Sequence, residues 1–344
     1  MRKGPSFVKI FVTGGAGYIG GNVAALLIEK GHHAVIFDNL SHSRRSAVPA
    51  GAEFIEGELA DRAALERIFR AAAEEGKPFD GVLHFAALIE AGESMEHPEL
   101  YFRNNSASTL SLLEAVLAWG PRRFVFSSTA AVYGEPETIP IQEDARLAPT
   151  NPYGQSKLLV EQMLAWFHRV HELRYASLRY FNVAGAHEGP QGVTRGEAHE
   201  PESHLIPLVL DVALGRRPFI RIYGDDYPSP DGTCIRDYIH VSDLADAHLL
   251  ALSALGAAAE KPSPLIYNFG NGKGFSVREV VESARRVTGH PIPAEVVPRR
   301  PGDPAVLVAS SQKAMRELGW KPRYVELDEI VRTAWIWHQK RYSM

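Results

Sequence analysis

The sequence predicts an α/β fold built on a doubly wound parallel sheet, followed by a smaller C-terminal α/β lobe. Two observations indicate this fold. In the first half, short runs of β-branched and aromatic residues alternate with longer helical stretches, as strands alternate with crossover helices in a parallel sheet. After about Asn182 the expected elements are shorter and the loops between them longer. We therefore divide the chain into residues 1–182 and 183–344, with a soft boundary.

The individual elements follow from run length and periodicity. Short runs of three to six residues rich in β-branched and aromatic side chains predict strands, and longer stretches with a helical pattern predict helices. The expected strands are 7–12, 34–37, 54–56, 82–85, 123–127 and 175–180, and the helices between them are 22–30, 63–75, 109–119 and 158–171. In the second half we expect shorter elements at 205–214, 242–255 and 277–288, and a tail at 327–340. A long polar loop is expected at 185–203 and an irregular loop stretch at 290–304, and the segment 265–269 can return to the main sheet.

Composition excludes several classes of protein. With 45% hydrophobic and 23% charged residues in 344, the chain has material for a globular core. A net charge of −4 offers no basic surface for nucleic acid, so we expect no nucleic-acid partner. No apolar run approaches the roughly 18 residues that cross a bilayer, so we expect no membrane partner. The single cysteine, Cys234, fits a reducing compartment, and we predict a cytoplasmic protein.

A glycine-rich turn directly after the first strand predicts a dinucleotide site. The turn reads Thr13-Gly14-Gly15-Ala16-Gly17-Tyr18-Ile19-Gly20 and leads into a helix. Glycines let backbone N–H groups approach a pyrophosphate, and the helix N-terminus adds partial positive charge. Asp38 follows Gly20 by 18 residues, at the end of the second strand. A carboxylate there accepts from ribose hydroxyls and repels a 2′-phosphate, which favours NAD over NADP in a Rossmann-type unit.

A tyrosine and a lysine one helical turn apart form a candidate acid–base pair. Tyr153 and Lys157 are at positions i and i+4. We expect the lysine ammonium and a bound nicotinamide cation to favour the phenolate and lower the tyrosine pKa. The hydroxyl cluster Ser127-Ser128-Thr129 follows the expected strand 123–127, and chemistry in doubly wound sheets gathers at strand C-terminal ends.

These motifs resemble the extended short-chain dehydrogenase/reductase superfamily and, within it, the UDP-glucose (UDP-galactose) 4-epimerase family. The resemblance extends from about Lys9 to Gln339 without a large gap. The blocks that carry it are Asp38-Asn39-Leu40, His84-Phe85-Ala86-Ala87, Gly92-Glu93-Ser94, Asn151-Pro152-Tyr153-Gly154, Leu178-Arg179-Tyr180-Phe181-Asn182, Gly232 to Val241 and Arg299 to Asp303.

The resemblance implies a reaction and a role for each matching residue. In that family a tyrosine exchanges a proton with the sugar O4 while C4 exchanges hydride with tightly held NAD, through a 4-keto sugar. Carried here, Tyr153 is the acid/base, Lys157 orients the cofactor ribose and Thr129 supports proton transfer. The implied cofactor contacts are Gly14, Gly17, Tyr18, Ile19, Gly20, Asp38, Asn39, Ser43, Glu58, Leu59, Phe85, Asn104, Ser127, Tyr153, Lys157 and Phe181.

The resemblance also implies a UDP-hexose as substrate and a homodimer as assembly. The implied substrate contacts are Thr129, Tyr153, Asn182, His204, Leu205, Tyr223, Arg236, Arg300, Asp303 and Leu307. The two arginines suit a diphosphate, because the planar guanidinium binds phosphate oxygens in pairs.

Four positions depart from the family pattern. Glu58 stands where an aspartate often meets the adenine, Ile89 replaces a lysine that touches the cofactor in some members, and His204 stands in place of an asparagine. Leu307 falls where a bulky tyrosine closes the pocket beside the sugar C2 substituent in some members. A smaller leucine predicts that 2-acetamido sugars are accepted as well as glucose and galactose.

Other functions remain as alternatives. A 4,6-dehydratase needs an added acid/base carboxyl pair, but Ala130-Ala131 follows Thr129. A decarboxylase or uronate epimerase stays open because its pocket for a C6 carboxylate is not readable from the residues. An NAD-sensing regulator on the same fold would not need the catalytic residues, so the presence of Thr129, Tyr153 and Lys157 favours an enzyme. We predict no metal, since beyond His168-x-x-His171 no ligand cluster stands out.

Overall fold

A seven-stranded sheet combines six strands from within residues 9–180 with one later strand. Its strand order is β12-β6-β5-β4-β1-β2-β3, with parallel pairing from β3 through β5, which confirms the predicted doubly wound architecture. This computed structural model describes residues 8–189, 192–256, 264–300 and 303–343. The strands are β1 (Lys9–Thr13), β2 (His33–Asp38), β3 (Glu53–Glu56), β4 (Gly81–His84), β5 (Arg123–Thr129), β6 (Arg174–Tyr180) and β12 (Leu265–Phe269). The segment 265–269 therefore does return to the main sheet, at its edge.

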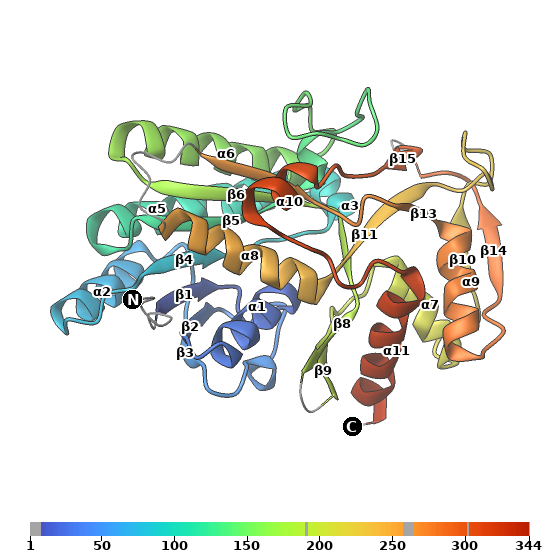
Figure 1. Cartoon of the computed structure of the whole chain (residues 1–344), viewed down its shortest axis with the longest axis horizontal. Coiled ribbons are helices and arrows are strands. Elements are labelled where there is room, and N and C mark those ends of the chain that lie inside the picture. The colour runs from blue at the N-terminus through green and yellow to red at the C-terminus, as the bar shows by residue number, and fades with distance from the viewer. Residues whose placement is uncertain (1–7, 190–191, 257–263, 301–302, 344) are drawn as a thin grey trace. The chain divides into compact units, whose positions relative to one another are not determined.

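Helices cover both faces of this sheet (Figure 1). One face packs under α2 (Arg62–Glu74), α5 (Ser108–Trp119) and α6 (Pro152–His171), which bury Phe69, Leu112 and Leu164 against Phe11 and other strand residues. On the other face lie α1 (Tyr18–Glu29) and α8 (Val241–Gly256). Shorter helical segments are η1 (Arg45–Ala47), α3 (Ala91–Glu96), α4 (Pro98–Tyr101), the π-helical η2 (Phe102–Ala107) and η3 (Ala130–Val132).

Polar residues at helix ends explain where the helices begin. The Asp61 carboxylate accepts from the Ala64 amide at 2.9 Å before α2, and the Asn151 side chain accepts from the Gly154 amide at 2.8 Å before α6. With Pro152 as its first residue, α6 begins before the predicted 158, so Tyr153 and Lys157 lie in its first two turns.

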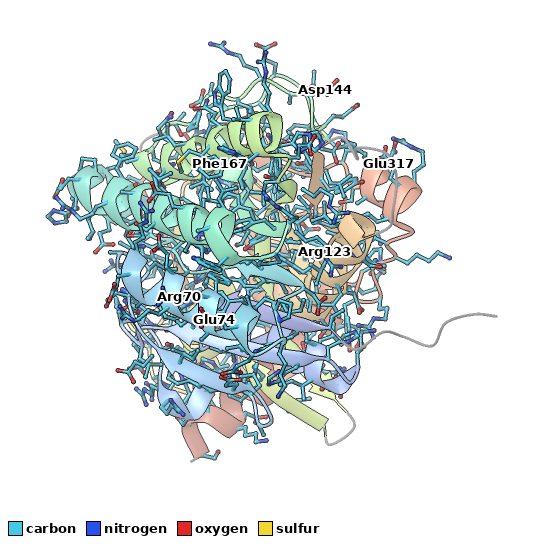
Figure 2. All side chains as sticks on the ribbon, turned by 90° about the vertical axis from the view of Figure 1, so that its left-hand side faces the viewer. Arg70, Glu74, Arg123, Asp144, Phe167 and Glu317 are labelled. Carbon is cyan, nitrogen blue, oxygen red and sulfur yellow. The ribbon has the colours of Figure 1, made fainter. Side chains whose placement is uncertain are left out.

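The outer face of α2 shows the amphipathic pattern that predicted it. Figure 2 labels Arg70 and Glu74, which pair at 4.0 Å one turn apart while Leu65 and Phe69 are buried. The helix therefore forms because one stripe of its surface is apolar.

The chain forms two compact units that are discontinuous in sequence. The first comprises 1–134, 147–179 and 245–267, and the second comprises 135–146, 180–244 and 268–344. The chain passes from one unit to the other five times. The predicted division into domains at Asn182 remains a prediction.

The second unit is built from short strands and three longer helices. Its core lies between α7 (Leu205–Ala213), α9 (Val277–Thr288) and α11 (Leu327–Ser343), where Val209, Val280 and Val331 are buried. The other elements are β7 (Asn182–Ala184), β8 (Ala186–Gly189), β9 (Gly192–Gly196), β10 (Ile220–Tyr223), β11 (Ile235–His240), β13 (Gly274–Ser276), β14 (Ala294–Val297), β15 (Val306–Leu307) and α10 (Gln312–Leu318).

Two loop predictions were wrong. The segment 185–203 contains the antiparallel pair β8 and β9, and 290–304 contains β14, which pairs with β10 in parallel. The polar, glycine-rich sequence gives no sign of the hairpin, because contacts with a distant helix stabilise it. Thr333 of α11 accepts from the Ala186 amide at 3.1 Å, and Trp337 of α11 donates to the Glu197 carbonyl, directly after β9, at 2.8 Å.

Within the described ranges, none of the helices has the length and apolar character needed to cross a bilayer. Residue 7, where the first strand was predicted to begin, lies outside the described residues, as do 190–191 and 301–302 within the two expected loops.

Candidate functional site

The turn between β1 and α1 is a glycine cradle that larger residues would fill. Gly14 has φ +69°, and a Cβ on it would lie 2.6 Å from the Ala86 amide nitrogen. A Cβ on Gly20 would lie 2.4 Å from the Gly14 carbonyl oxygen. Since no side chain caps α1, the helix N-terminus presents backbone N–H groups to a ligand. Such a cradle fits a pyrophosphate.

Asp38 ends β2 beside this cradle. Its buried carboxylate accepts from the Ala16 amide at 3.0 Å, the Leu40 amide at 2.9 Å and the Ser43 hydroxyl at 3.1 Å. One residue further along the chain, the Asn39 amide group donates to Glu58 at 3.1 Å. The structure thus brings the predicted acceptors for an adenosine ribose and adenine to one edge of the sheet, with Leu59 packed against the core below.

Four predicted residues, Ser127, Thr129, Tyr153 and Lys157, lie where β5 ends and α6 begins. Lys157 is buried and its Nζ donates to the Ser127 carbonyl at 2.9 Å, while Thr129 hydrogen-bonds Tyr153. Tyr153 is half-buried, and its ring meets Tyr101 edge-on at 6.4 Å. Since all of these belong to the first unit, they share a frame with the glycine cradle.

The electrostatics of this group differ from the expectation. Burial raises the pKa of Tyr153 above 10.0, the Thr129 hydrogen bond lowers it, and the charge of Glu90 raises it further. Burial also lowers the pKa of Lys157 to about 7, so the lysine carries only part of a positive charge at neutral pH. In the protein chain alone, the predicted lowering of the tyrosine pKa is therefore not seen, because desolvation and the charge of Glu90 together outweigh the Thr129 hydrogen bond.

Two further predicted cofactor residues, Phe85 after β4 and Asn104 within η2, contact neighbouring side chains. The Phe85 ring lies 4.8 Å from the His248 ring. Asn104 donates to Asn105 at 2.9 Å, and Asn105 is held by the Leu88 amide at 2.8 Å. The π-helical turn is a local irregularity of the kind often found at functional sites. Phe181 is buried in the second unit, where its amide donates to the Phe269 carbonyl at 3.2 Å.

The second unit contains a cavity of 480 Å³. It is lined by seven of the predicted substrate residues: Asn182, His204, Leu205, Tyr223, Arg236, Arg300 and Asp303. The Arg300 guanidinium lies 3.9 Å from the centre of the Tyr223 ring, and its hydrogen bond lowers the pKa of Tyr223. Arg236 forms an ion pair with Asp303. Two guanidinium groups in one cavity suit a diphosphate.

Leu307 is not among the described residues that line this cavity. It lies in β15, in register with Arg236 of β11. Thr129 and Tyr153 belong to the first unit.

Sequence reasoning missed other residues of the cavity wall, including Phe219, Arg221, Arg217 and Cys234. Phe219, Arg221 and Tyr223 alternate with the buried Ile220 and Ile222. This period of two was the signal that could have placed them on the same face as the predicted tyrosine.

Contrary to the sequence argument, a cluster of potential metal ligands is present. Glu197, His199, Glu202 and His204 offer four ligand atoms within 4.8 Å of one another. They follow β9 in an irregular segment, so no helical or strand spacing revealed them. Burial alone would lower the pKa of His204, but the charge of Glu197 and hydrogen bonds to both glutamates raise it well above 6.5.

Comparison with known proteins places these features in context. Residues 10–270 match the model of the NAD dependent epimerase/dehydratase family. A protein named UDP-glucose 4-epimerase from Streptomyces lividans is 55% identical over 330 residues, which cover 96% of each chain.

Solved structures agree. The UDP-glucose 4-epimerase from Brucella ovis in complex with NAD is 44% identical, with a TM-score of 0.90 over 96% of this chain and 98% of that one. The enzyme from Stenotrophomonas maltophila with NAD and formylated UDP-arabinopyranose is 39% identical, with a TM-score of 0.91 over 98% and 99% of the two chains.

Proposed function

This chain belongs to the NAD dependent epimerase/dehydratase family, and we propose that it interconverts UDP-galactose and UDP-glucose through a transient 4-keto sugar. The observation that carries the proposal is the group of Thr129, Tyr153 and Lys157 assembled in the same unit as a glycine cradle and Asp38. The relatives named UDP-glucose 4-epimerase match nearly the whole chain, which supports this reaction over others on the same fold.

The residues of the first unit fit NAD. The cradle at Gly14, Gly17 and Gly20 accepts the pyrophosphate at the start of α1, and the Asp38 carboxylate receives the adenosine ribose hydroxyls. When bound, NAD supplies the hydride acceptor and donor for C4 of the sugar. Lys157, held on the Ser127 carbonyl, orients the nicotinamide ribose.

Tyr153 moves the proton. Its phenolate accepts the proton of the sugar 4-hydroxyl as C4 is oxidised, and its phenol returns a proton to O4 after the keto sugar has presented its other face. Thr129 hydrogen-bonds the phenol oxygen and favours the phenolate. Because one group serves both directions, the reaction needs no further acid or base.

The cavity of the second unit binds the nucleotide diphosphate. Arg236 and Arg300 pair with the phosphate oxygens, and Asn182, Leu205 and Tyr223 line the remaining wall. Asp303 holds Arg236 through their ion pair, so that the guanidinium is oriented before substrate binds. The family resemblance assigns His204 and Leu307 to the sugar end of the site, where a leucine is smaller than the tyrosine of some members and would leave room for a 2-acetamido group.

The test is turnover without added cofactor. Purified protein is incubated with UDP-galactose and the sugar nucleotides are followed by NMR. We expect UDP-glucose to appear, and Tyr153→Phe to lower kcat by about 10²–10⁴, the contribution of a positioned acid/base. Tyr175→Phe, which removes a phenol from the core cluster, is the matched control and keeps most of the activity.

Two results would contradict the proposal. Absence of conversion even with added NAD would remove the specific reaction, and unchanged kcat in Tyr153→Phe would remove the assigned base. The same assay with UDP-N-acetylgalactosamine tests Leu307: no detectable turnover of that sugar overturns the proposed tolerance and leaves the main reaction intact.

A homodimer in the cytoplasm completes the proposal. The lone, buried Cys234 suits a reducing compartment. Exposed apolar side chains on α5 and α6, including Trp119 and Trp166, supply surface for a second copy.

A further inference from the structure

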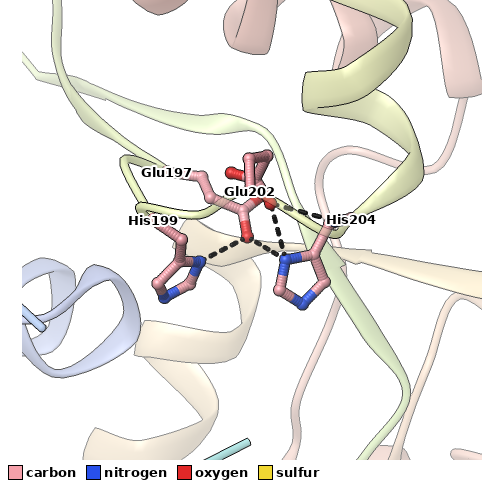
Figure 3. A group of neighbouring side chains, drawn as sticks. All are labelled: Glu197, His199, Glu202 and His204. Carbon is pink, nitrogen blue, oxygen red and sulfur yellow. Dashed lines mark hydrogen bonds and ion pairs between the residues drawn. The ribbon is translucent and has the colours of Figure 1, made fainter. Parts of the chain in front are cut away.

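Four ligand-type side chains converge in the segment between β9 and α7. Figure 3 shows Glu197, His199, Glu202 and His204 facing one another. His204 Nδ1 lies 2.8 Å from Glu197 Oε1 and 2.9 Å from Glu202 Oε1, and His199 Nδ1 lies 3.0 Å from Glu197 Oε1. Each histidine thus presents the same ring nitrogen to the carboxylates.

Protons alone satisfy this cluster incompletely. The single N–H at His204 Nδ1 is shared by two carboxylates, and Glu197 Oε1 is contacted by both imidazoles. Glu202 is only 10% exposed, yet its second oxygen, Oε2, is buried without a hydrogen-bond partner among the described residues. A buried carboxylate oxygen that lacks a partner is destabilising. A dication would balance the two carboxylate charges, and Glu202 keeps a second oxygen, Oε2, that no hydrogen bond among the described residues occupies.

The cluster is also held from outside, as metal ligands usually are. The amides of Ser203 and His204 both donate to Glu202 Oε1 at 2.9 Å. Trp337 of α11 donates to the Glu197 carbonyl at 2.8 Å, and α7 begins directly after His204. The ligands are therefore placed by a helix start and by a contact with a distant helix.

We propose that Glu197, His199, Glu202 and His204 bind a first-row divalent transition-metal ion, with Zn²⁺ as the probe. Two imidazole nitrogens and two carboxylate oxygens form a four-coordinate set that such ions accept. Zinc–ligand bonds of about 2.1 Å place the ligand atoms of a tetrahedral site about 3.4 Å from one another. The histidine nitrogens and carboxylate oxygens that now lie 2.8–3.0 Å apart would therefore separate by roughly 0.5 Å when zinc binds. Binding displaces the Nδ1 protons to solvent.

The site adjoins the cavity of the second unit, because Glu197 and His204 also line that cavity. Because the bound ion would be held by His204 as well as by the carboxylates, it would fix the His204 ring on the cavity wall. The inference concerns binding and does not depend on the proposed reaction.

The experiment measures metal content and stability of the full-length protein with its cofactor. Chelator-treated protein is dialysed against Zn²⁺ together with a competing chelator, and bound zinc is determined by elemental analysis. His199→Ala and Glu202→Gln are compared with His33→Ala, which removes a histidine that lies outside the cluster and pairs with Glu53 at 3.7 Å. NAD content and unfolding temperature verify that each variant is folded.

We expect one zinc per chain in the native protein and in His33→Ala, and loss of affinity by at least about 10–100-fold in the two cluster variants. Zn²⁺ should also raise the unfolding temperature of the native protein but not of His199→Ala. Equal zinc content in all four proteins, or none in any of them, would overturn the proposal. Cobalt replacing zinc should give visible d–d bands only where the cluster is intact.

Discussion

At the scale of single residues, burial sets the charge states around the strand ends. His84, the last residue of β4, is fully buried between two hydroxyls, with Thr13 at 2.6 Å and Thr109 at 2.7 Å from its ring nitrogens. Burial, and then the charge of Lys157, lower the pKa of His84 to about 3. The imidazole is therefore neutral in the folded protein at pH values where it would be protonated in the unfolded chain.

This shift predicts acid sensitivity. Between pH 6.5 and about pH 3, His84 is protonated in the unfolded chain but neutral in the folded protein. The free energy of unfolding therefore decreases as the pH falls through that range. The slope is at most about 1.4 kcal/mol per pH unit for one group. Scanning calorimetry across this range should show a shallower fall of the unfolding temperature in His84→Gln than in the native protein.

The variant His33→Gln serves as the control for that measurement, since it removes an imidazole that is 34% exposed. If His84→Gln keeps the native pH dependence, the buried imidazole is not the source of the acid sensitivity.

At the scale of elements, the turn from β1 to α1 combines close packing with an open helix end. Gly14 has positive φ and touches the backbone of Ala86 after β4, so two strand ends and the helix start share one small volume. Gly31, after α1, has φ +80°, but a Cβ added to it would meet no heavy atom within 4 Å. The two glycines separate the effect of backbone conformation from the effect of close approach.

We therefore predict different outcomes for two alanine substitutions. Gly31→Ala should lower stability by about 1–2 kcal/mol, the cost of a left-handed backbone with a Cβ, and keep its NAD. Gly14→Ala adds the collision with Ala86 and should lose most of its bound NAD as well. Each variant is denatured by heat, and the NAD that it releases is quantified by chromatography, which gives the fraction of chains that had bound NAD. Full occupancy in Gly14→Ala would show that the cradle is not the pyrophosphate site.

At the scale of the whole molecule, the pattern of exposed apolar side chains bears on assembly. Trp166 and Val170 are one turn apart on α6 and are 61% and 62% exposed, and Leu110 on α5 is 38% exposed. Large apolar side chains gathered on exposed helices are typical of interaction surfaces.

If the protein is a homodimer through this surface, charges placed there will separate it. The double variant Trp166→Glu/Val170→Glu should elute as a monomer in size-exclusion chromatography with light scattering. Met315→Glu, which charges an exposed apolar position on α10, should leave the mass unchanged. A native protein that is already monomeric, or a variant that remains dimeric, contradicts the proposed interface.

Features that depend on short stretches of chain could be predicted from the residues alone. The alternation of strands and helices predicted a doubly wound parallel sheet, which has seven strands in the structure. The glycine-rich turn from Thr13 to Gly20, with Asp38 following 18 residues later, predicted a cradle and a carboxylate at the ends of the first two strands. Tyr153 and Lys157 fall on one side of α6 because a helical turn has 3.6 residues. Such patterns can be read locally, since neighbours in sequence remain neighbours in space.

Features that depend on contacts between distant segments could not be predicted in this way. The β8–β9 hairpin forms against α11, about 140 residues later, and the cluster around Glu197 and His204 forms in irregular chain held by Trp337. Burial, which depends on every surrounding element, brought the pKa of Lys157 down to about 7 and held that of Tyr153 above its ordinary value. Desolvation and long-range contacts have no signature in residue spacing, because they arise only when the chain has closed around them.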